Sequence, residues 1–333
     1  MASFATFGND LYTGKRSYNI VGRRTIRYVV AAVMILIAII VPIARGGFVF
    51  GIEFKGGSQF QVNNVTNLSQ PFASSVVSKT VANAHPTVTI VGTNDVRIQT
   101  NQLTSDESVK IKNALASAYK VDVKDVASSF IGASWGQDIT KQALTGLIIF
   151  VILVAIVMAL YFRTWKMSVA ALISLAHDLI ITAGVYGVLG IEVTPAAVIG
   201  FLTILGYSLY DTVVVFDKIR ENTFEDGESS RRTFAESVNL AINQTLVRSI
   251  NTSIVAILPV ASILFIGAVL LGAGTLRDIS LALFIGIIAG TYSTIFIAAP
   301  VYAHLRSGEA AIIKRDKRAI VNRKAAMTTV DAE

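Results

Sequence analysis

Six long apolar segments limit what this chain can fold into. They lie at about residues 27–44, 142–162, 167–190, 196–216, 250–271 and 279–304. Each comes close to the ~20 residues that an α-helix needs to cross a bilayer. The 333 residues are 53% hydrophobic, more than a soluble domain needs for one core. The sequence therefore predicts a polytopic α-helical membrane protein with six transmembrane helices.

Basic residues flank these segments and predict their orientation. Arg23, Arg24 and Arg27 before the first segment also fit a cleaved secretory signal, but Arg45 follows directly and favours an uncleaved anchor. Because short cytoplasmic flanks collect lysine and arginine, both termini are expected in the cytoplasm. The predicted organisation is a cytoplasmic N-terminal segment (1–26), a first transmembrane helix (27–44), an extracytoplasmic domain (45–141), a five-helix transmembrane region (142–304) with a cytoplasmic loop (217–249), and a basic cytoplasmic tail (305–333).

Residues 45–141 are predicted to form one small α+β domain. Alternating apolar residues indicate strands at about 48–54, 59–62, 88–90, 96–98 and 121–131. Gly56-Gly57 reads as a tight hairpin turn, although the 59–62 strand could also continue the first one. Helices are expected from Pro71 and after a capping box at 104–107. The order strand, helix, strand, strand, helix, strand predicts a ferredoxin-like sandwich.

The sequence gives no support to chemical catalysis. It has no cysteine, which excludes disulfides, thiol nucleophiles and zinc–thiolate sites, and it has no phosphate-binding loop or HExxH motif. His85 has no companion, and Asp106 and Glu107 fit the first turn of a helix. The net charge of +7 gathers at the termini and membrane flanks, so no nucleic-acid binding is expected. We expect no metal, no cofactor and no catalytic residues.

Asp211 lies inside the fourth apolar segment, where such a group costs roughly 2.5–3.5 kcal/mol on insertion scales. Tyr207 precedes it by one turn on the same helix face. We interpret the carboxylate as a proton-binding group. The alternative is a structural hydrogen bond between helices.

Two further places in the spans carry ionisable residues. His177 and Asp178 lie near the middle of the third segment. A histidine can simply bond a neighbouring helix, whereas an aspartate there needs a polar partner or water, so Asp178 is the stronger candidate. Arg248 opens the fifth segment, where its position alone indicates an arginine reaching to the interface. Supporting polar or close-packing roles are predicted for Tyr207, Ser208, Thr212, Asn251, Thr252, Gly206, Gly286 and Gly290.

The fourth segment also carries a long motif. Residues 203–222, TILGYSLYDTVVVFDKIREN, resemble the signature of the SecF family of bacterial protein-export membrane subunits. Similar stretches follow in the same order at 51–57, 176–178, 243–253 and 286–300, and the resemblance covers residues 23–305. The chain departs from the family pattern at Glu53, where aspartate is usual, and at 133–135, where a Gly-Pro-like turn is common.

The resemblance implies a twelve-span assembly with SecD, like the RND transporters, in the bacterial inner membrane. It implies action beside the SecYEG channel and the SecA motor on a translocating unfolded polypeptide, with membrane lipid as the other contact. Asp211 and Arg248 match the family's intramembrane charged positions. We hypothesise that Asp211 is protonated from outside and deprotonated toward the cytoplasm, with Arg248 favouring its ionised form in one conformation. An RND-type exporter half and a non-catalytic membrane scaffold are the alternatives.

Overall fold

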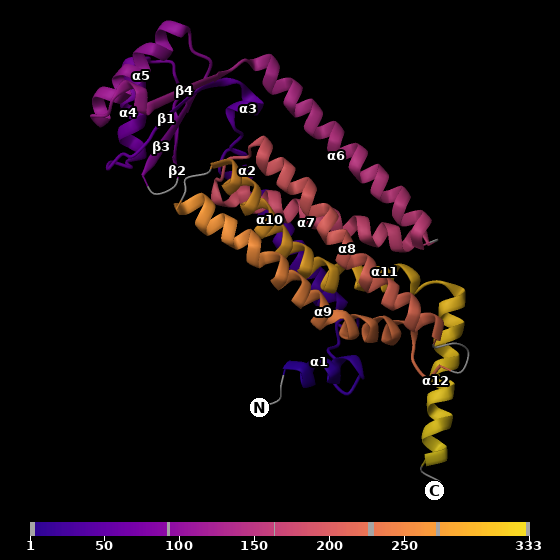
Figure 1. Ribbon diagram of the computed structural model, residues 1–333. Coiled ribbons are helices and arrows are strands. Elements are labelled where there is room, and N and C mark those ends of the chain that lie inside the picture. Colours follow the sequence, from indigo (N-terminus) through magenta and orange to yellow (C-terminus); the bar gives the residue numbers. More distant parts are fainter. Residues whose placement is uncertain (1–3, 92–93, 163, 226–229, 271–273, 331–333) are drawn as a thin grey trace.

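The computed structural model describes residues 4–91, 94–162, 164–225, 230–270 and 274–330 (Figure 1). Within these ranges six helical segments are long and apolar enough to cross a membrane, which confirms the predicted architecture. They are α2 (Arg24–Ala44), α6 (Ala133–Phe162), α7 (Trp165–Leu189), α8 (Pro195–Glu225), α9 (Phe234–Ser262) with the π-helical η2 (Ile263–Leu270), and α10 (Gly274–Ser293) with η3 (Thr294–Ala298) and α11 (Ala299–Arg306).

The connection between α8 and α9 is much shorter than the predicted loop 217–249. Helix α8 continues to Glu225 and α9 already begins at Phe234. A capping box made by Thr233 and Glu236 fixes the start of α9, because each residue bonds the backbone N–H of the other. The polar residues taken for a loop are therefore helical extensions of two spans, and residues 226–229 lie outside the described part of the chain.

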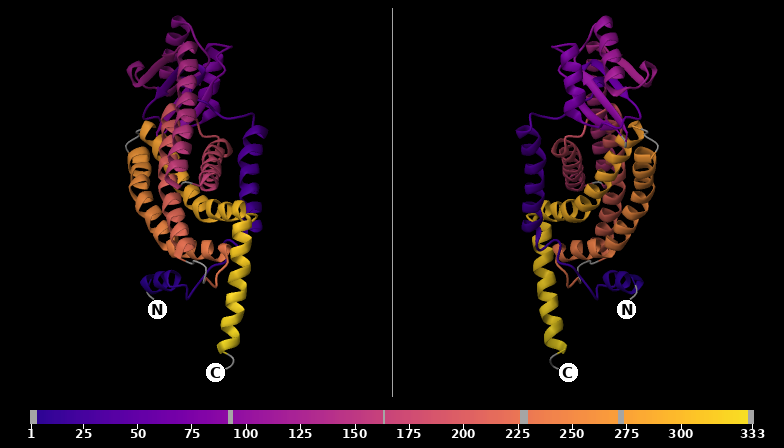
Figure 2. Two further views of the ribbon diagram at one scale, coloured as in Figure 1. Left: turned by 90° about the vertical axis from the view of Figure 1, so that its right-hand side faces the viewer. Right: turned by 90° about the vertical axis from the view of Figure 1, so that its left-hand side faces the viewer.

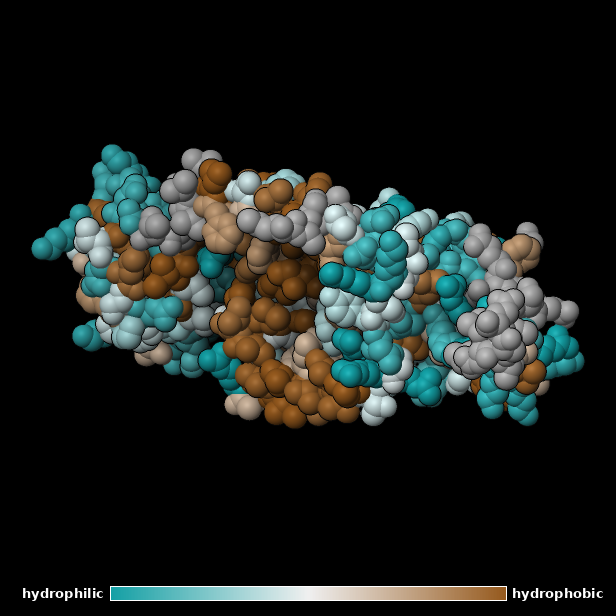
Figure 3. Space-filling model, turned by 90° about the horizontal axis from the view of Figure 1, so that it is seen from below, coloured by the Kyte–Doolittle hydropathy of each residue, from teal (hydrophilic) through white to brown (hydrophobic). Residues whose placement is uncertain are grey.

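Helix α8 lies at the centre of the helical region, in contact with α7, α9 and α10, and α2 packs on α7. Helix α6 is peripheral: its apolar span is only 6% buried, against 56% for the span of α10 and α11. Figure 1 shows α6 standing apart along one side. Seen from below, the molecule carries a hydrophobic band between two hydrophilic ends (Figure 3). This is the surface expected of a membrane-spanning region.

The outer domain is an antiparallel sheet with two helices on one face. Its elements are β1 (Gly57–Val62), α4 (Gln70–Thr80), β2 (Thr87–Val91), β3 (Asp95–Thr100), α5 (Ser105–Tyr119), the 3₁₀ turn η1 (Val123–Asp125) and β4 (Val126–Ile131). The strands are ordered β2-β3-β1-β4, as in a ferredoxin-like sandwich. Phe60 of β1 pairs with Ile98 of β3, and both are fully buried against α4 and α5. The element order matches the sequence prediction, including the capping box at Thr104.

The predicted strand at 48–54 is wrong. Residues Ile52–Lys55 form the short helix α3, and Phe50 makes only an isolated bridge with Val193. Phe48 and Phe54 pack against a cluster of the membrane helices, so their alternation comes from contact with the bundle and not from a sheet. Gly56 and Gly57, with φ of 74° and 141°, lead from α3 into β1 and form no hairpin turn. The last strand begins at Val126, not at 121.

The two terminal helices are α1 (Phe4–Tyr12) and α12 (Ala310–Val330). Figures 1 and 2 place both at the end of the helical region opposite the outer domain, and α12 extends away from it. Helix α1 packs on α9, where Gly8 lies beside Val247. The chain therefore has its two termini on one side and its outer domain on the other.

Candidate intramembrane polar site

Asp178 lies where α7, α8 and α10 meet, and its side chain is fully buried. Its Oδ2 accepts a hydrogen bond of 2.5 Å from Ser208 Oγ of α8. On α10, a Cβ added to Gly290 would lie 3.5 Å from the same oxygen and 3.1 Å from Ser208, so a glycine here lets the third helix approach. The predicted residues Asp178, Ser208 and Gly290 thus form one contact.

His177 shares this site although it neighbours Asp178 in the sequence. Its Nδ1 lies 3.3 Å from Asp178 Oδ1, and its ring lies 6.0 Å from the ring of Tyr292 on α10. His177 is 3% exposed, and its Nε2 has no hydrogen-bond partner among the described residues. Nδ1 can therefore donate a hydrogen bond to the carboxylate in one tautomer, while Nε2 stays open to a further partner.

Asp211 forms a second buried site between α8 and α9. It is 6% exposed, and its Oδ1 accepts a hydrogen bond of 2.9 Å from Ser249 Oγ. Its Oδ2 has no partner in the described part of the chain, and neither has the buried hydroxyl of Tyr207, four residues earlier. A buried carboxylate oxygen without a donor requires a proton, a water or a rearranged neighbour.

Arg248 does not reach the Asp211 carboxylate: within the described ranges no ion pair joins the two. Its side chain is exposed and lines a cavity of about 480 Å³ with Asp217, Lys218 and Glu221. Val214, one turn after Asp211 on α8, lines the same cavity. Because α9 begins well before residue 250, Arg248 lies within this helix and does not open it.

The neighbouring polar residues differ in whether their side chains bond to another helix. Thr212 shares a hydrogen bond of 3.0 Å with Thr294 of η3, as predicted for a residue between helices. Among the described residues, Thr252 bonds to the Arg248 carbonyl of its own helix and to no other helix, and Asn251 is exposed, so neither links helices there. Ser249 and Ser253 were not among the predicted site residues, although both lie in the polar stretch 243–253; Ser253 Oγ lies 2.5 Å from Thr291 Oγ1 on α10. Their spacing of four residues marks one helix face, which is the signal that could have found them.

Two of the three predicted glycines act as close-packing positions. A Cβ on Gly286 would collide with Ile204 of α8, and Gly290 meets Ser208. Gly206 is different, because a Cβ there would meet nothing within 4 Å. It faces outward from α8, so the prediction that it thins this helix for packing is wrong. No group of three or more His, Asp or Glu in the described ranges is placed to hold a metal ion.

Comparison with known proteins gives the family of this chain. Residues 110–308 match the family "Protein export membrane protein SecD/SecF, C-terminal". The protein translocase subunit SecF of Streptomyces coelicolor is 44% identical over 97% of this chain and 86% of its own, and that of Mycobacterium tuberculosis H37Rv is 41% identical over 96% and 74%.

A longer relative and a solved structure agree with this. The protein translocase subunit SecDF of Thermus thermophilus is 32% identical over 81% of this chain, which spans 36% of that relative. A crystal structure of SecDF, described as a translocon-associated membrane protein, superposes with a TM-score of 0.75 at 28% identity, covering 87% of this chain and 39% of the other. With its six spans, its small outer domain and these relatives, the chain belongs to the SecF family of protein translocase subunits.

Proposed function

We propose that this protein acts with SecD, beside the SecYEG channel and the SecA motor, to promote proton-motive-force-dependent translocation and release of unfolded polypeptides across the bacterial cytoplasmic membrane. The Thermus thermophilus relative supports the pairing, because its name joins both subunits and this chain spans only 36% of it. A separate SecD chain supplies the remainder. The curated relatives are named as translocase subunits, which favours this function over an RND-type exporter half.

The observation that carries proton coupling is the pair of buried carboxylates in the spans. Asp178 and Asp211 are 0% and 6% exposed, and each accepts a hydrogen bond from a serine of the next helix. Carboxyl groups at such depth are costly and mark proton relays. One charge moved across ~100 mV yields about 2.3 kcal/mol, which is the size of an ordinary conformational coupling.

Asp211 exchanges the proton, and the cavity beside Arg248 is its route to the cytoplasm. The cavity reaches Val214, three residues and roughly 4.5 Å along α8 from Asp211. Arg248 lines the same cavity and attracts the carboxylate when α8 and α9 shift. The basic flanks support the orientation, with N- and C-termini in the cytoplasm and the outer domain outside. The protein performs no chemical catalysis and requires no cofactor.

The test uses membrane vesicles that carry this chain with SecD and a translocating substrate. Asp211→Asn is expected to abolish the gradient-dependent part of substrate release at equal abundance of the complex. Asp106→Asn, which makes the same chemical change at an exposed position on α5 of the outer domain, is the matched control and is expected to retain it. Unchanged release by Asp211→Asn would reduce the carboxylate to a hydrogen bond between helices and leave the protein a scaffold.

A further inference from the structure

The sheet of the outer domain has one face that its own helices leave open. Helices α4 and α5 cover the face that carries Phe60 and Ile98. The opposite face carries the row Ser129, Gln59, Gln99 and Thr87, one residue from each strand. Glutamine, serine and threonine cannot form an apolar core, so this face binds water, as at the exposed Ser129 and Thr87, or polar groups of another element. One such polar group lies in the short connection between α7 and α8.

Glu192 of that connection joins the sheet to the membrane helices. It is 8% exposed; its Oε1 accepts a hydrogen bond from Gln99 Nε2, and its Oε2 lies 3.6 Å from Arg97 Nη1. Two residues later, Thr194 Oγ1 donates a hydrogen bond of 2.8 Å to Asp278 Oδ2 at the start of α10. The connection is thus bonded to the sheet on one side and to the bundle on the other.

This contact is electrostatically incomplete. Glu53 of α3 reaches the same place, since a Cβ on Gly51 would touch both Glu53 Oε2 and Glu192 Oε1. Glu53 Oε2 and Arg97 Nε are buried without hydrogen-bond partners in the described ranges. The carboxylates of Glu53, Glu192 and Asp278 face the guanidinium groups of Arg97 and Arg277. Burial raises the pKa of Glu53; Glu192 and Asp278 add to this, and a backbone hydrogen bond and Arg97 oppose it.

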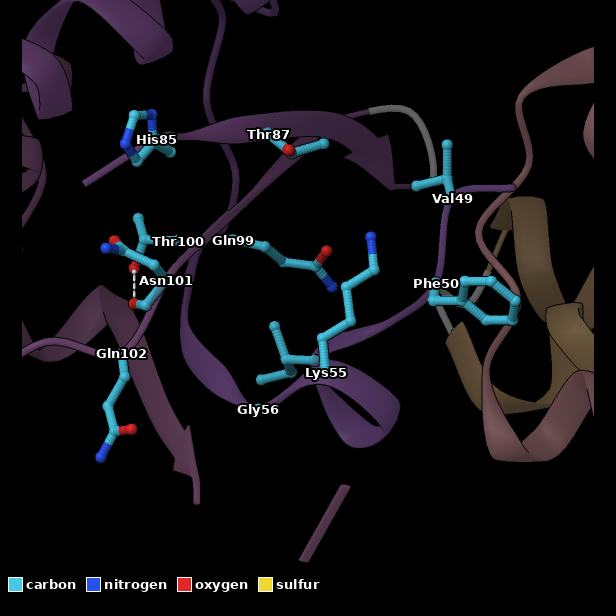
Figure 4. A pocket seen from close by; sticks show the side chains of 11 residues that line it. Val49, Phe50, Lys55, Gly56, His85, Thr87, Gln99, Thr100, Asn101 and Gln102 are labelled. Atoms are coloured by element: carbon cyan, nitrogen blue, oxygen red, sulfur yellow. Dashed lines mark hydrogen bonds between the residues drawn. The ribbon is translucent and has the colours of Figure 1, made fainter. Parts of the chain in front are cut away.

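Glycines lie at both chain connections between the sheet and the bundle: Gly56 and Gly57 follow α3, and Gly132 alone separates β4 from α6. The segment before α3 is held by two backbone bonds, from Gly51 N to Val193 O (3.0 Å) and from Val193 N to Val49 O (2.7 Å). Gly56 and Gly57 then connect α3 to the sheet with positive φ angles that other residues rarely adopt. Figure 4 shows Gln99 of β3 and Lys55 of α3 directed into a cavity between these parts, and its volume is about 340 Å³. The sheet thus borders a cavity on the side of the bundle, and both of its chain connections to the bundle pass through glycines.

We propose that Arg97, Gln99 and Glu192 form a releasable domain latch, which holds the outer domain on the bundle and opens in one step of the working cycle. Glu192 closes it by accepting from Gln99 and attracting Arg97. Glu53 Oε2 and Arg97 Nε, which are buried without hydrogen-bond partners in the described ranges, lower the stability of the closed state. These three residues are positioning residues: they hold the outer domain against the α7–α8 connection. This inference rests on the proposed function only for the step at which the latch opens.

The absence of cysteine allows a direct test by paired cysteines in the full chain with its partner. Thr89 of β2 and Leu189 of α7 line one cavity of about 260 Å³ across the junction, and replacing them leaves the latch residues intact. Thr89→Cys/Leu189→Cys is treated in sealed vesicles with a short bis-methanethiosulfonate crosslinker, which joins the two cysteines through disulfide bonds that a reductant cleaves. Imposing a proton gradient is expected to slow crosslinking several-fold. The matched control is Val109→Cys/Asn113→Cys, which pairs two exposed residues one turn apart on α5 and is expected to react equally in both conditions.

A latch variant and a functional readout complete the test. Glu192→Gln in the junction pair is expected to slow crosslinking several-fold without a gradient, because the Arg97 ion pair is lost. Crosslinking rates that ignore both the gradient and Glu192→Gln would show a fixed contact and overturn the proposal. The crosslinking assay does not require protein export. If crosslinking responds to the gradient in vesicles that show no gradient-dependent release, the latch is supported and only the proposed function is contradicted. When the latch is crosslinked shut, release is expected to fall to the Asp211→Asn level and to return with reductant.

Discussion

Ser249→Ala tests whether the buried carboxylate of Asp211 depends on its hydrogen bond from α9. The serine hydroxyl donates to Oδ1 at 2.9 Å, and Oδ2 has no partner among the described residues. The substitution removes one oxygen from a fully buried position and adds no bulk. The Asp211 carboxylate is then left without a donor in the described part of the chain, so the protein is expected to lose stability.

The structure sets bounds on that loss. Hydrogen bonds between membrane helices contribute about 0.6 kcal/mol on average and up to about 1.7 kcal/mol. Bonds to charged groups contribute about 1.5–3 kcal/mol. We therefore expect a loss of about 0.6–1.7 kcal/mol when the carboxyl group is protonated and up to about 3 kcal/mol when it is ionised. The measured value reports the charge state of Asp211 at the pH of the experiment.

The assay is reversible unfolding in mixed detergent micelles, carried out as a double-mutant cycle with Asp211→Leu, which removes the acceptor that Asn would keep. Thr252→Val is the matched control, because among the described residues the Thr252 hydroxyl bonds to a carbonyl of its own helix and to no other helix, and its effect is expected to stay within about 0.5 kcal/mol. If Ser249→Ala and Asp211→Leu are additive within about 0.3 kcal/mol, the two side chains do not interact and the reasoning fails.

Other substitutions give separate outcomes. Gly286→Val is expected to cost about 1–3 kcal/mol in the same unfolding assay, because its side chain meets Ile204, whereas Gly206→Ala is expected to cost nothing. Since the pKa of Glu53 is raised above its ordinary 4.5, the docked domain binds more protons, and docking weakens as pH rises through that raised pKa; Glu53→Gln is expected to remove this dependence of the junction crosslinking rate. Thr104→Ala removes a capping box and is expected to lower the outer domain's unfolding free energy by about 0.5–2 kcal/mol.

The spans could be predicted because a helix that crosses a bilayer requires a long apolar segment, which is easily recognised in the sequence. An unbroken run of about twenty apolar residues is rare outside membrane-spanning helices, and all six predicted segments coincide with helices in the structure. The predicted ends were less accurate, since a helix that leaves the membrane continues with polar residues. The capping box at Thr233 and Glu236 carried the information for the start of α9, but the apolar run alone begins only near residue 250.

The strand predicted at 48–54 is absent because a period of two in aromatic residues does not specify the surface that buries them. Phe48 and Phe54 pack on the membrane helices, and only Phe50 forms a bridge. The same limit applies to Glu192 and Asp278, for which the sequence analysis predicted no role. Their importance lies in tertiary contacts with β3 and with Thr194, which no local pattern contains.

The buried carboxylates could be predicted from the sequence, but their partners could not. Mid-span aspartates are rare enough to stand out, which is why Asp178 and Asp211 were predicted as sites. Their partners are serines, which are common in membrane helices, and only the rotation of α9 distinguishes Ser249 from Asn251. A helical-wheel plot that starts from one known contact would have ranked these serines above their neighbours, because residues four apart share a helix face.

Helix α8 connects the two parts of the proposed mechanism. It begins at Pro195, three residues after Glu192, and runs without interruption through Asp211 to Glu225. The stretch from residue 195 to residue 211 spans about 24 Å at about 1.5 Å per residue, so a shift of α8 on proton exchange moves the base of the latch. Binding linkage is reciprocal: if a proton on Asp211 changes the latch equilibrium by some factor, a locked latch changes the proton affinity by the same factor. Equal proton uptake by locked and reduced protein, measured by infrared absorption of the carboxyl group, would show that α8 does not couple the two sites.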